Sequence, residues 1–155
     1  MNPPDARARP ADDRALRAFD RSLPMALLRA REAVMSRFRP ILAEHGVTEQ
    51  QWRVLRALSS AADPLSVGDL SEQTFLLGPS LSRMLASLEE RSLIERGSAA
   101  DDARRAVIRI APAGRDLVAT IGPESEATYR HIADALGDDA LDSLYDLLER
   151  TAATA

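Results

Sequence analysis

Arginine is the residue type in this sequence whose side chain offers the clearest binding chemistry. The chain has 155 residues, and all 20 basic residues are arginine, against 24 acidic residues and a formal net charge of −4. The densest basic run comprises Arg104, Arg105, Arg109 and Arg115, with no acid between them. A guanidinium pairs well with phosphate and carboxylate groups. This run is therefore suited to binding an anion, although a charge run can also be a merely solvated surface.

A second group of polar side chains lies on one face of a helix predicted from about Pro79 to Arg91. Leu81, Met84 or Leu85, and Leu88 repeat at helical spacing and form its buried face. The opposite face carries Pro79, Ser80, Ser82, Arg83, Ala86 and Ser87. Such a face could contact double-stranded DNA. Small hydroxyl side chains permit close approach to the floor of the major groove, and Arg83 can bind a guanine or a phosphate.

Catalytic and metal-binding chemistry has little support. The chain has no cysteine, which excludes a disulfide, a thiolate zinc site and a cysteine nucleophile. The only histidines, His45 and His131, are far apart in the sequence, and neither a nucleophile elbow nor a phosphate-binding loop is found. We therefore expect no enzyme, no metal site and no cofactor. A helical protein-interaction adaptor without DNA binding is the best rival class.

The negative charge is concentrated at the C-terminal end. Residues 1–47 contain nine arginines and six acids, residues 48–110 eight and nine, and residues 111–155 three and nine. An acidic chain can thus present a basic central surface. No apolar run approaches the ~18 residues that a membrane span needs. The N-terminus lacks the apolar segment of a secretory signal. We expect a cytoplasmic protein with no membrane association.

The N-terminal part predicts a tail followed by a long helix. Residues 1–20 are rich in Pro, Asp and Arg and predict a flexible tail. From Leu23 onward, apolar residues recur at helical spacing. Pro40 should bend or end this helix, and Gly46 is a typical helix stop.

Two capping-box patterns mark the starts of the next two helices. Thr48 precedes Gln51 by three residues, and Ser66 precedes Asp69 by the same spacing. In such a box the side chains satisfy free N–H groups of the first helical turn. The Asp63-Pro64 pair separates the two helices.

The periodicity then changes from helical to extended. Leu93–Gly97 is short and extended, and Ala106–Ile110 alternates and is rich in Val and Ile. Asp101 and Asp102 are turn formers in the polar tip between them. These segments predict a β-hairpin with a basic tip.

Helices are predicted again after the hairpin. Pro112 should begin one that runs to about Leu136 and that Gly122-Pro123 kinks or divides. A last helix follows Gly137, with one apolar stripe formed by Leu141, Leu144, Tyr145 and Leu148.

This order of elements predicts a mainly α fold with a small β-hairpin. Residues 48–111 form a winged helix-turn-helix, in which the helix from Pro79 enters the major groove of double-stranded DNA. Residues 21–47 and 112–151 are flanking helices of the same single domain, 21–155. Their apolar stripes need a partner, and a second copy of the chain is the economical one. The alternative is that they only cap the central domain.

Two segments resemble the MarR family of transcriptional regulators. SLSRMLASLE at 80–89 resembles the recognition helix of that family. Residues 97–114, with Asp102 and Arg104 and then IAPAG, resemble the wing and the start of the next helix. The resemblance implies that Asp102 orients Arg104 toward DNA and that Arg105 lies beside it. Ala111 departs from the usual Thr, which removes a capping hydroxyl only.

A further resemblance narrows the subgroup. ALLRAREAVMSRFRP at 26–40 and TEQQWR at 48–53 resemble the homoprotocatechuate-degradation regulators of this family. The resemblance implies a repressor of a 4-hydroxyphenylacetate catabolic operon, which a phenolic acid releases from a palindromic operator. Salicylate-like compounds and hydroxycinnamates are alternative effectors.

An aromatic carboxylate requires a guanidinium and a flat apolar wall. Charge could come from Arg31, Arg39 and Arg53, and the wall from Met35 and Trp52. Each has a structural alternative. Met35 and Trp52 are at core spacing, and the arginines could simply pair with nearby glutamates, Glu32, Glu44 or Glu49.

Overall fold

Helices make up most of the chain, as the sequence predicted. The computed structural model describes residues 16, 18–99, 104 and 106–154. They group into two compact units, 1–35 and 36–155. The boundary lies within the first long helix, α1, Leu23–Glu44, which a short 3₁₀ helix, Phe19–Arg21, precedes. Pro40 lies inside α1, so the helix does not end there; it ends before the turn at Gly46, whose φ is +64°.

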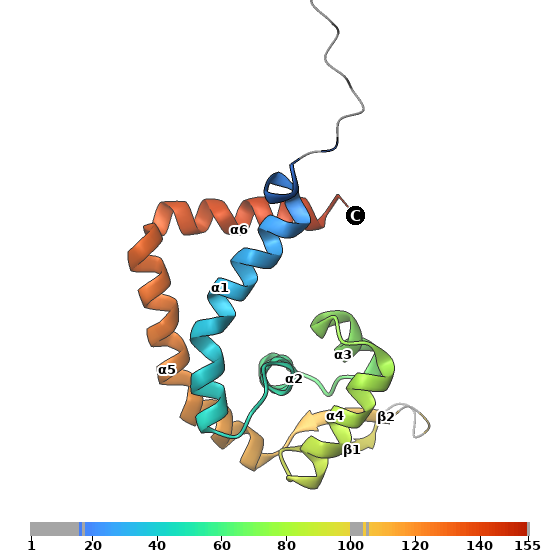
Figure 1. Cartoon of the computed structure of the whole chain (residues 1–155). Coiled ribbons are helices and arrows are strands. Elements are labelled where there is room, and N and C mark those ends of the chain that lie inside the picture. Colours follow the sequence, from blue (N-terminus) through green and yellow to red (C-terminus); the bar gives the residue numbers. More distant parts are fainter. Residues whose placement is uncertain (1–15, 17, 100–103, 105, 155) are drawn as a thin grey trace, which may run out of the picture. The chain divides into compact units, whose positions relative to one another are not determined.

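Three helices and a hairpin form the centre of the second unit (Figure 1). They are α2, Glu49–Ser60; α3, Val67–Thr74; and α4, Gly78–Glu90. Both predicted capping boxes are present: Thr48 and Gln51 bond reciprocally at the start of α2, and Ser66 and Asp69 do so at the start of α3. These local signals fix where the two helices begin.

The hairpin consists of β1, Ile94–Ser98, and β2, Ala106–Ile110, paired antiparallel with Ile94 opposite Ile110. Leu65, in the loop between α2 and α3, forms a bridge to Ile108 through two backbone hydrogen bonds of 2.9 and 2.7 Å. The base of the hairpin is therefore attached to the loop that follows α2.

The main core lies between α2, α3, α4 and the hairpin. Leu55, Leu70, Leu81 and Leu85 are all fully buried within it. Complete burial of one such side chain contributes about 1.5–3 kcal/mol. The three leucines predicted for the buried face of α4 all belong to this core, which fixes the opposite face of α4 outward.

Two helices complete the second unit: α5, Pro112–Leu136, and α6, Asp138–Ala152. Contrary to one expectation, Gly122-Pro123 does not divide α5, which continues through Pro123. Ile121 and Ser125, on either side, are buried, and this tertiary packing outweighs the lost hydrogen bond of the proline.

The last helix has an apolar stripe but no buried residue. Leu144, Tyr145, Leu147 and Leu148 of α6 are between 39% and 56% exposed. A helix with one apolar face gains stability only by covering that face, so α6 presents a surface suited to a partner.

Candidate nucleic-acid interface and effector site

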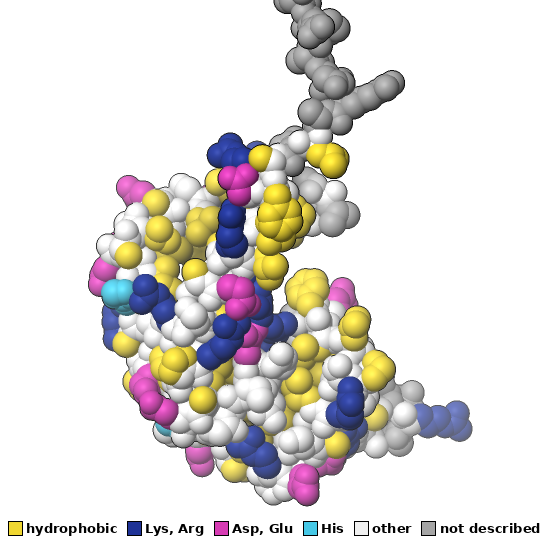
Figure 2. All heavy atoms as spheres, in the orientation of Figure 1, with side chains coloured by type: hydrophobic (Ala, Val, Ile, Leu, Met, Phe, Trp, Pro, Cys, Tyr) yellow, Lys and Arg dark blue, Asp and Glu magenta, His cyan; other side chains and the backbone are white. Residues whose placement is uncertain are grey.

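The outward face of α4 carries the residues predicted to contact DNA. Pro79, Ser80, Ser82 and Arg83 are exposed, whereas Ser87 is half-buried. Among the described residues, Arg83 has no hydrogen-bond or ion-pair partner, so its guanidinium remains available for an external group. Basic side chains are visible over α4 and at the end of the hairpin (Figure 2).

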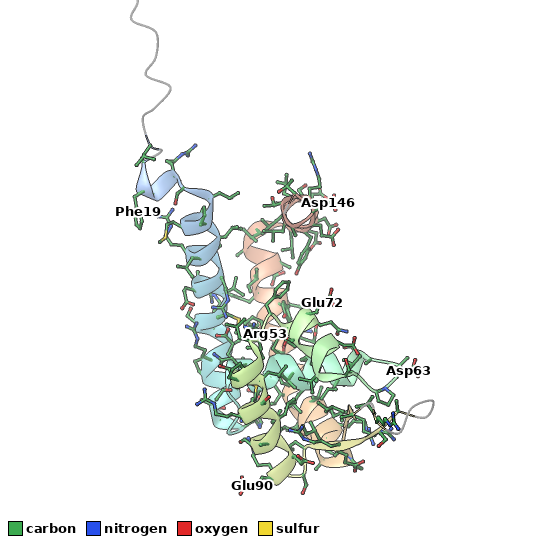
Figure 3. The ribbon with its side chains drawn as sticks, turned by 90° about the vertical axis from the view of Figure 1, so that its right-hand side faces the viewer. Phe19, Arg53, Asp63, Glu72, Glu90 and Asp146 are labelled. Atoms are coloured by element: carbon green, nitrogen blue, oxygen red, sulfur yellow. The ribbon has the colours of Figure 1, made fainter. Side chains whose placement is uncertain are left out.

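The turn before α4 is held by hydrogen bonds to its backbone. Ser71 Oγ donates to the carbonyl of Leu76 at 2.7 Å, and Arg53 Nη1 donates to the carbonyl of Thr74 at 2.8 Å (Figure 3). Phe75 between them has a left-handed φ of +54°, a conformation that disfavours bulky residues. These bonds hold α3 and α4 in a defined relation, as a helix-turn-helix requires.

The hairpin is tied to the other end of α4. Arg96 Nε of β1 donates to Glu89 Oε2 at 2.8 Å. Arg104, near the tip, is exposed. Asp102 and Arg105, the other two residues predicted for the wing contact, lie outside the described residues. An ion pair therefore connects α4 to β1, in addition to the core that they share.

Two of the predicted effector residues, Arg31 and Met35, belong to the first unit. The guanidinium of Arg31 lies 3.0 Å from Oε1 of its neighbour Glu32, and both side chains are exposed. Met35 is half-buried. For Arg31, the alternative of a pair with a nearby glutamate is observed.

Two others, Arg39 and Arg53, share one acidic partner in the second unit. Glu49 Oε2 accepts from Arg39 Nε at 3.3 Å, and Glu49 Oε1 accepts from Arg53 Nη2 at 3.1 Å. With its bond to Thr74, Arg53 links α2 to the end of α3. Its guanidinium has a structural role in this state.

Trp52, the fifth predicted effector residue, lies beside Arg56, an arginine that was not predicted as a site residue. Trp52 is half-buried and packs against both core clusters of the unit. The guanidinium carbon of Arg56 lies 5.9 Å from the centroid of the Trp52 ring, within cation–π range. Arg56 is exposed and has no carboxylate partner among the described residues. The i,i+4 spacing of Trp52 and Arg56 on α2 was the available signal.

Tyr129 of α5 is a further residue that was not among the predicted effector residues. Its ring packs against that of Phe38 in a tilted arrangement, with an interplanar angle of 55° and centroids 4.9 Å apart. Burial, followed by the neighbouring Tyr145, raises the pKa of the Tyr129 hydroxyl, and the positive charge of Arg56 opposes this increase. The opposing effect places Arg56 within electrostatic range of the tyrosine. Arg56 and Trp52 of α2 therefore offer a guanidinium and an indole to an aromatic anion, and α5, which carries Tyr129, packs against α2.

Comparisons with known proteins agree with this geometry. Residues 45–105 match a family model described as the MarR family. Over 131 residues, the chain is 37% identical to the HTH-type transcriptional regulator FarR of Neisseria gonorrhoeae, covering 84% of this chain and 89% of that protein. The chain belongs to the MarR family.

Two further relatives of this MarR protein have aromatic acids in their names. The homoprotocatechuate degradative operon repressor of Escherichia coli is 37% identical over 128 residues, covering 83% of this chain and 86% of that protein. The crystal structure of NadR in complex with 4-hydroxyphenylacetate is 36% identical, with a TM-score of 0.79, covering 89% of this chain and 97% of that one. The predicted family and winged-helix fold are confirmed, and the chain is a transcriptional regulator rather than an enzyme.

The described residues contain neither a metal-ligating cluster nor a membrane-spanning helix. No group of three potential metal-ligating side chains is found among the described residues. No helix among them is long and apolar enough to cross a membrane.

Proposed function

We propose that this MarR protein represses an operon for the breakdown of an aromatic acid and that a phenolic carboxylate releases it from DNA. The observation that carries the proposal is the pairing of Arg56 with the Trp52 ring on α2, in a chain related to a homoprotocatechuate operon repressor and to NadR. The name of the first relative supports the operon, and the ligand of the second supports the effector.

DNA contact divides between α4 and the wing. Arg83 supplies base or phosphate contact from the exposed face of α4, with Pro79, Ser80, Ser82 and Ser87 forming a close-fitting surface around it. Arg104 of the wing, with Asp102 and Arg105, supplies contacts to the backbone or minor groove. No lysine is present, so every side-chain cation at this interface is a guanidinium.

The effector set combines predicted and newly found residues. Arg56 pairs with the ligand carboxylate, since it has no competing carboxylate among the described residues, and Trp52 supplies the flat wall. The hydroxyl of Tyr129 is protonated at neutral pH and can donate to the ligand. Arg31, Met35, Arg39 and Arg53 remain predicted members of the effector set.

The active species is a homodimer. The exposed apolar stripe of α6 supports this, because an uncovered stripe of this kind is characteristic of an interface. A twofold dimer presents two α4 helices to the two halves of a palindromic operator. Effector binding that changes the spacing of these helices weakens operator binding, and a coupling of about 1–3 kcal/mol is usual.

A mobility-shift titration with DNA from upstream of its own coding sequence tests the DNA-binding part. We expect salt-sensitive binding that Arg83→Ala and Arg104→Ala each weaken about tenfold or more, since a guanidinium contact to a base is worth ~1–3 kcal/mol. Arg130→Ala, which removes an exposed arginine of α5 outside this surface, is the matched control. Absence of binding at low salt would contradict the proposal.

Repeating the titration with 4-hydroxyphenylacetate tests the effector part. We expect the compound to release the wild-type protein and to raise its thermal stability, by ~2.7 kcal/mol at 100 times the dissociation constant. Arg56→Gln should bind DNA normally but no longer respond. Arg31→Ala tests the sequence-based assignment in the same way. A full response in Arg56→Gln rejects the role of that residue.

Other effector classes need the same test. The FarR relative is as similar in identity as the homoprotocatechuate operon repressor is, so similarity alone does not select one regulatory subgroup. Salicylates and hydroxycinnamates belong in the same titration. Release by one of these compounds alone would keep the regulator and replace its ligand.

A further inference from the structure

A cavity lies in the second unit, at the base of the wing hairpin. It has a volume of about 270 Å³ and lies between the end of α2 with its following loop, strand β2 and the beginning of α5. Its lining residues are Leu58, Ala61, Ala62, Asp63, Pro64, Ile108, Arg109, Ile110 and Arg115. None of these residues belongs to the predicted effector set or to the predicted DNA contacts.

Part of this wing-base cavity is apolar. Leu58, Ile108 and Ile110 are 4%, 1% and 7% exposed, so they are core residues that each present one side to the cavity. Ala61 and Ala62 add small side chains that leave space. A fully hydrated ion gains nothing from such a surface, whereas a ligand with an apolar body does.

Two guanidinium groups from different elements complete the lining. Arg115 Nη1 donates to the carbonyl of Ile110 at 2.8 Å, which fixes the side chain while its remaining N–H groups stay available. Arg109 is on an exposed position of β2 and has no hydrogen-bond or ion-pair partner among the described residues. Asp63 is the one acid of the lining, and Figure 3 shows it at the outer edge of its loop.

We propose that the wing-base cavity binds a small organic monocarboxylate, with its apolar body on Leu58 and Ile110 and its carboxylate on Arg109 and Arg115. Two arginines against one aspartate give the lining a net positive charge. The volume lies just below the range of about 300–1,000 Å³ of drug-sized sites, which favours a compact ligand such as a single ring. Polar atoms supply the larger part of the cavity surface and apolar atoms the smaller part, so contact with Leu58 and Ile110 is the minor contribution that separates such a molecule from a phosphate of the DNA backbone.

A ligand in this cavity would affect the wing directly. The loop carrying Ala61 to Pro64 continues into Leu65, whose two backbone hydrogen bonds hold Ile108 of β2. The bound molecule would contact both sides of this attachment and stabilise the base of the hairpin that carries Arg104. The site therefore adds a second input to DNA binding, independent of the Trp52–Arg56 site.

Two-dimensional amide NMR of the full chain with benzoate as the probe tests the proposal. Trp52 is the only tryptophan, so its indole N–H reports on the first site, while the amides of Ala61, Ala62 and Ile110 report on the cavity. We expect saturable shifts at the cavity amides with benzoate and none with neutral benzamide. Arg109→Gln should raise the benzoate concentration for half-saturation about tenfold, and Ala62→Phe should abolish the cavity shifts by filling the space.

Two controls keep the result interpretable. Arg130→Gln, which removes an exposed arginine away from the cavity lining, should leave the titration unchanged, and Arg56→Gln should remove only the Trp52 response. Equal cavity shifts in wild type and Arg109→Gln would overturn the proposal. It would also be overturned if benzoate caused no cavity shifts while Arg109→Gln reduced operator affinity and its salt dependence, because the cavity would then contact a DNA phosphate.

Discussion

At the scale of single residues, Glu49 pairs with two arginines from different helices. Its side chain is only 11% exposed, and its two oxygens bind Arg39 of α1 and Arg53 of α2. Arg53 in turn holds the carbonyl that precedes the left-handed residue Phe75. Glu49 therefore stabilises the turn into α4 indirectly, because it helps to fix the position of Arg53.

Replacement of Glu49 should measure this connection. Glu49→Gln keeps the shape but leaves two guanidinium groups without a full counter-charge, and we expect a loss of about 1–3 kcal/mol in the free energy of unfolding. Urea denaturation checks the value. Glu72→Gln, at an exposed position of α3 without these pairs, is the control and should change stability by less than about 0.5 kcal/mol. Equal midpoints for the two variants would refute the assignment.

The sequence predicts a contact more readily when the two residues are close together along the chain. The capping boxes at Thr48 and Ser66 were predicted because both partners lie within one helical turn. The pairing of Arg31 and Arg53 with nearby glutamates was also anticipated. Tyr129 was missed because its partner, Phe38, is on a distant helix, and no local pattern specifies which faces of two helices meet. Arg56 was missed although its spacing from Trp52 was visible.

At the scale of elements, Gly114 decides how closely α5 approaches the hairpin. A Cβ at this position would lie 2.1 Å from the carbonyl oxygen of Leu93 and 2.9 Å from the side chain of Ile110. The main chain must therefore move if any side chain is added. This contact fixes the start of α5 against the strands of the wing.

An alanine pair along α5 tests this close approach. Gly114→Ala should destabilise the protein by several kcal/mol, at the high end of the range for single substitutions, because backbone atoms obstruct the new methyl group. Gly122→Ala, in the same helix, has nothing within 4 Å of the added Cβ and should be neutral or gain up to about 1 kcal/mol. Thermal unfolding of both variants makes the comparison. Similar melting temperatures would show that the hairpin yields.

Element boundaries followed from the sequence wherever a local signal existed. The strands Ile94–Ser98 and Ala106–Ile110 agree closely with the predicted pair, since alternation of buried residues is a local property. Gly122-Pro123 was predicted to kink or divide α5, and of these two alternatives division was wrong, because the helix continues through Pro123. A proline weakens a helix locally, but the buried residues on both sides of it reflect long-range packing that the sequence pattern does not express.

At the scale of the whole molecule, the uncovered apolar stripe of α6 supports the proposed homodimer. A Leu148→Glu substitution places a charge among Leu144, Tyr145 and Leu147 on this helix. We expect the variant to be monomeric by light scattering and to bind a palindromic operator at least tenfold more weakly, because only one α4 helix then engages at a time. Ser143→Glu, which adds the same charge to α6 on the side away from Leu141, Leu144, Tyr145 and Leu148, should remain dimeric. A dimeric Leu148→Glu protein would show that the interface lies elsewhere.

The stripe of α6 belongs to the most acidic part of the chain, and this has a consequence for regulation. Residues 111–155 contain nine acids and three arginines, so two copies that meet through α6 bring like charges together. Added salt screens that repulsion over a Debye length of about 10 Å at 0.1 M and favours the dimer, while it weakens every guanidinium–phosphate contact. At low protein concentration, operator occupancy should therefore pass through a maximum as ionic strength rises.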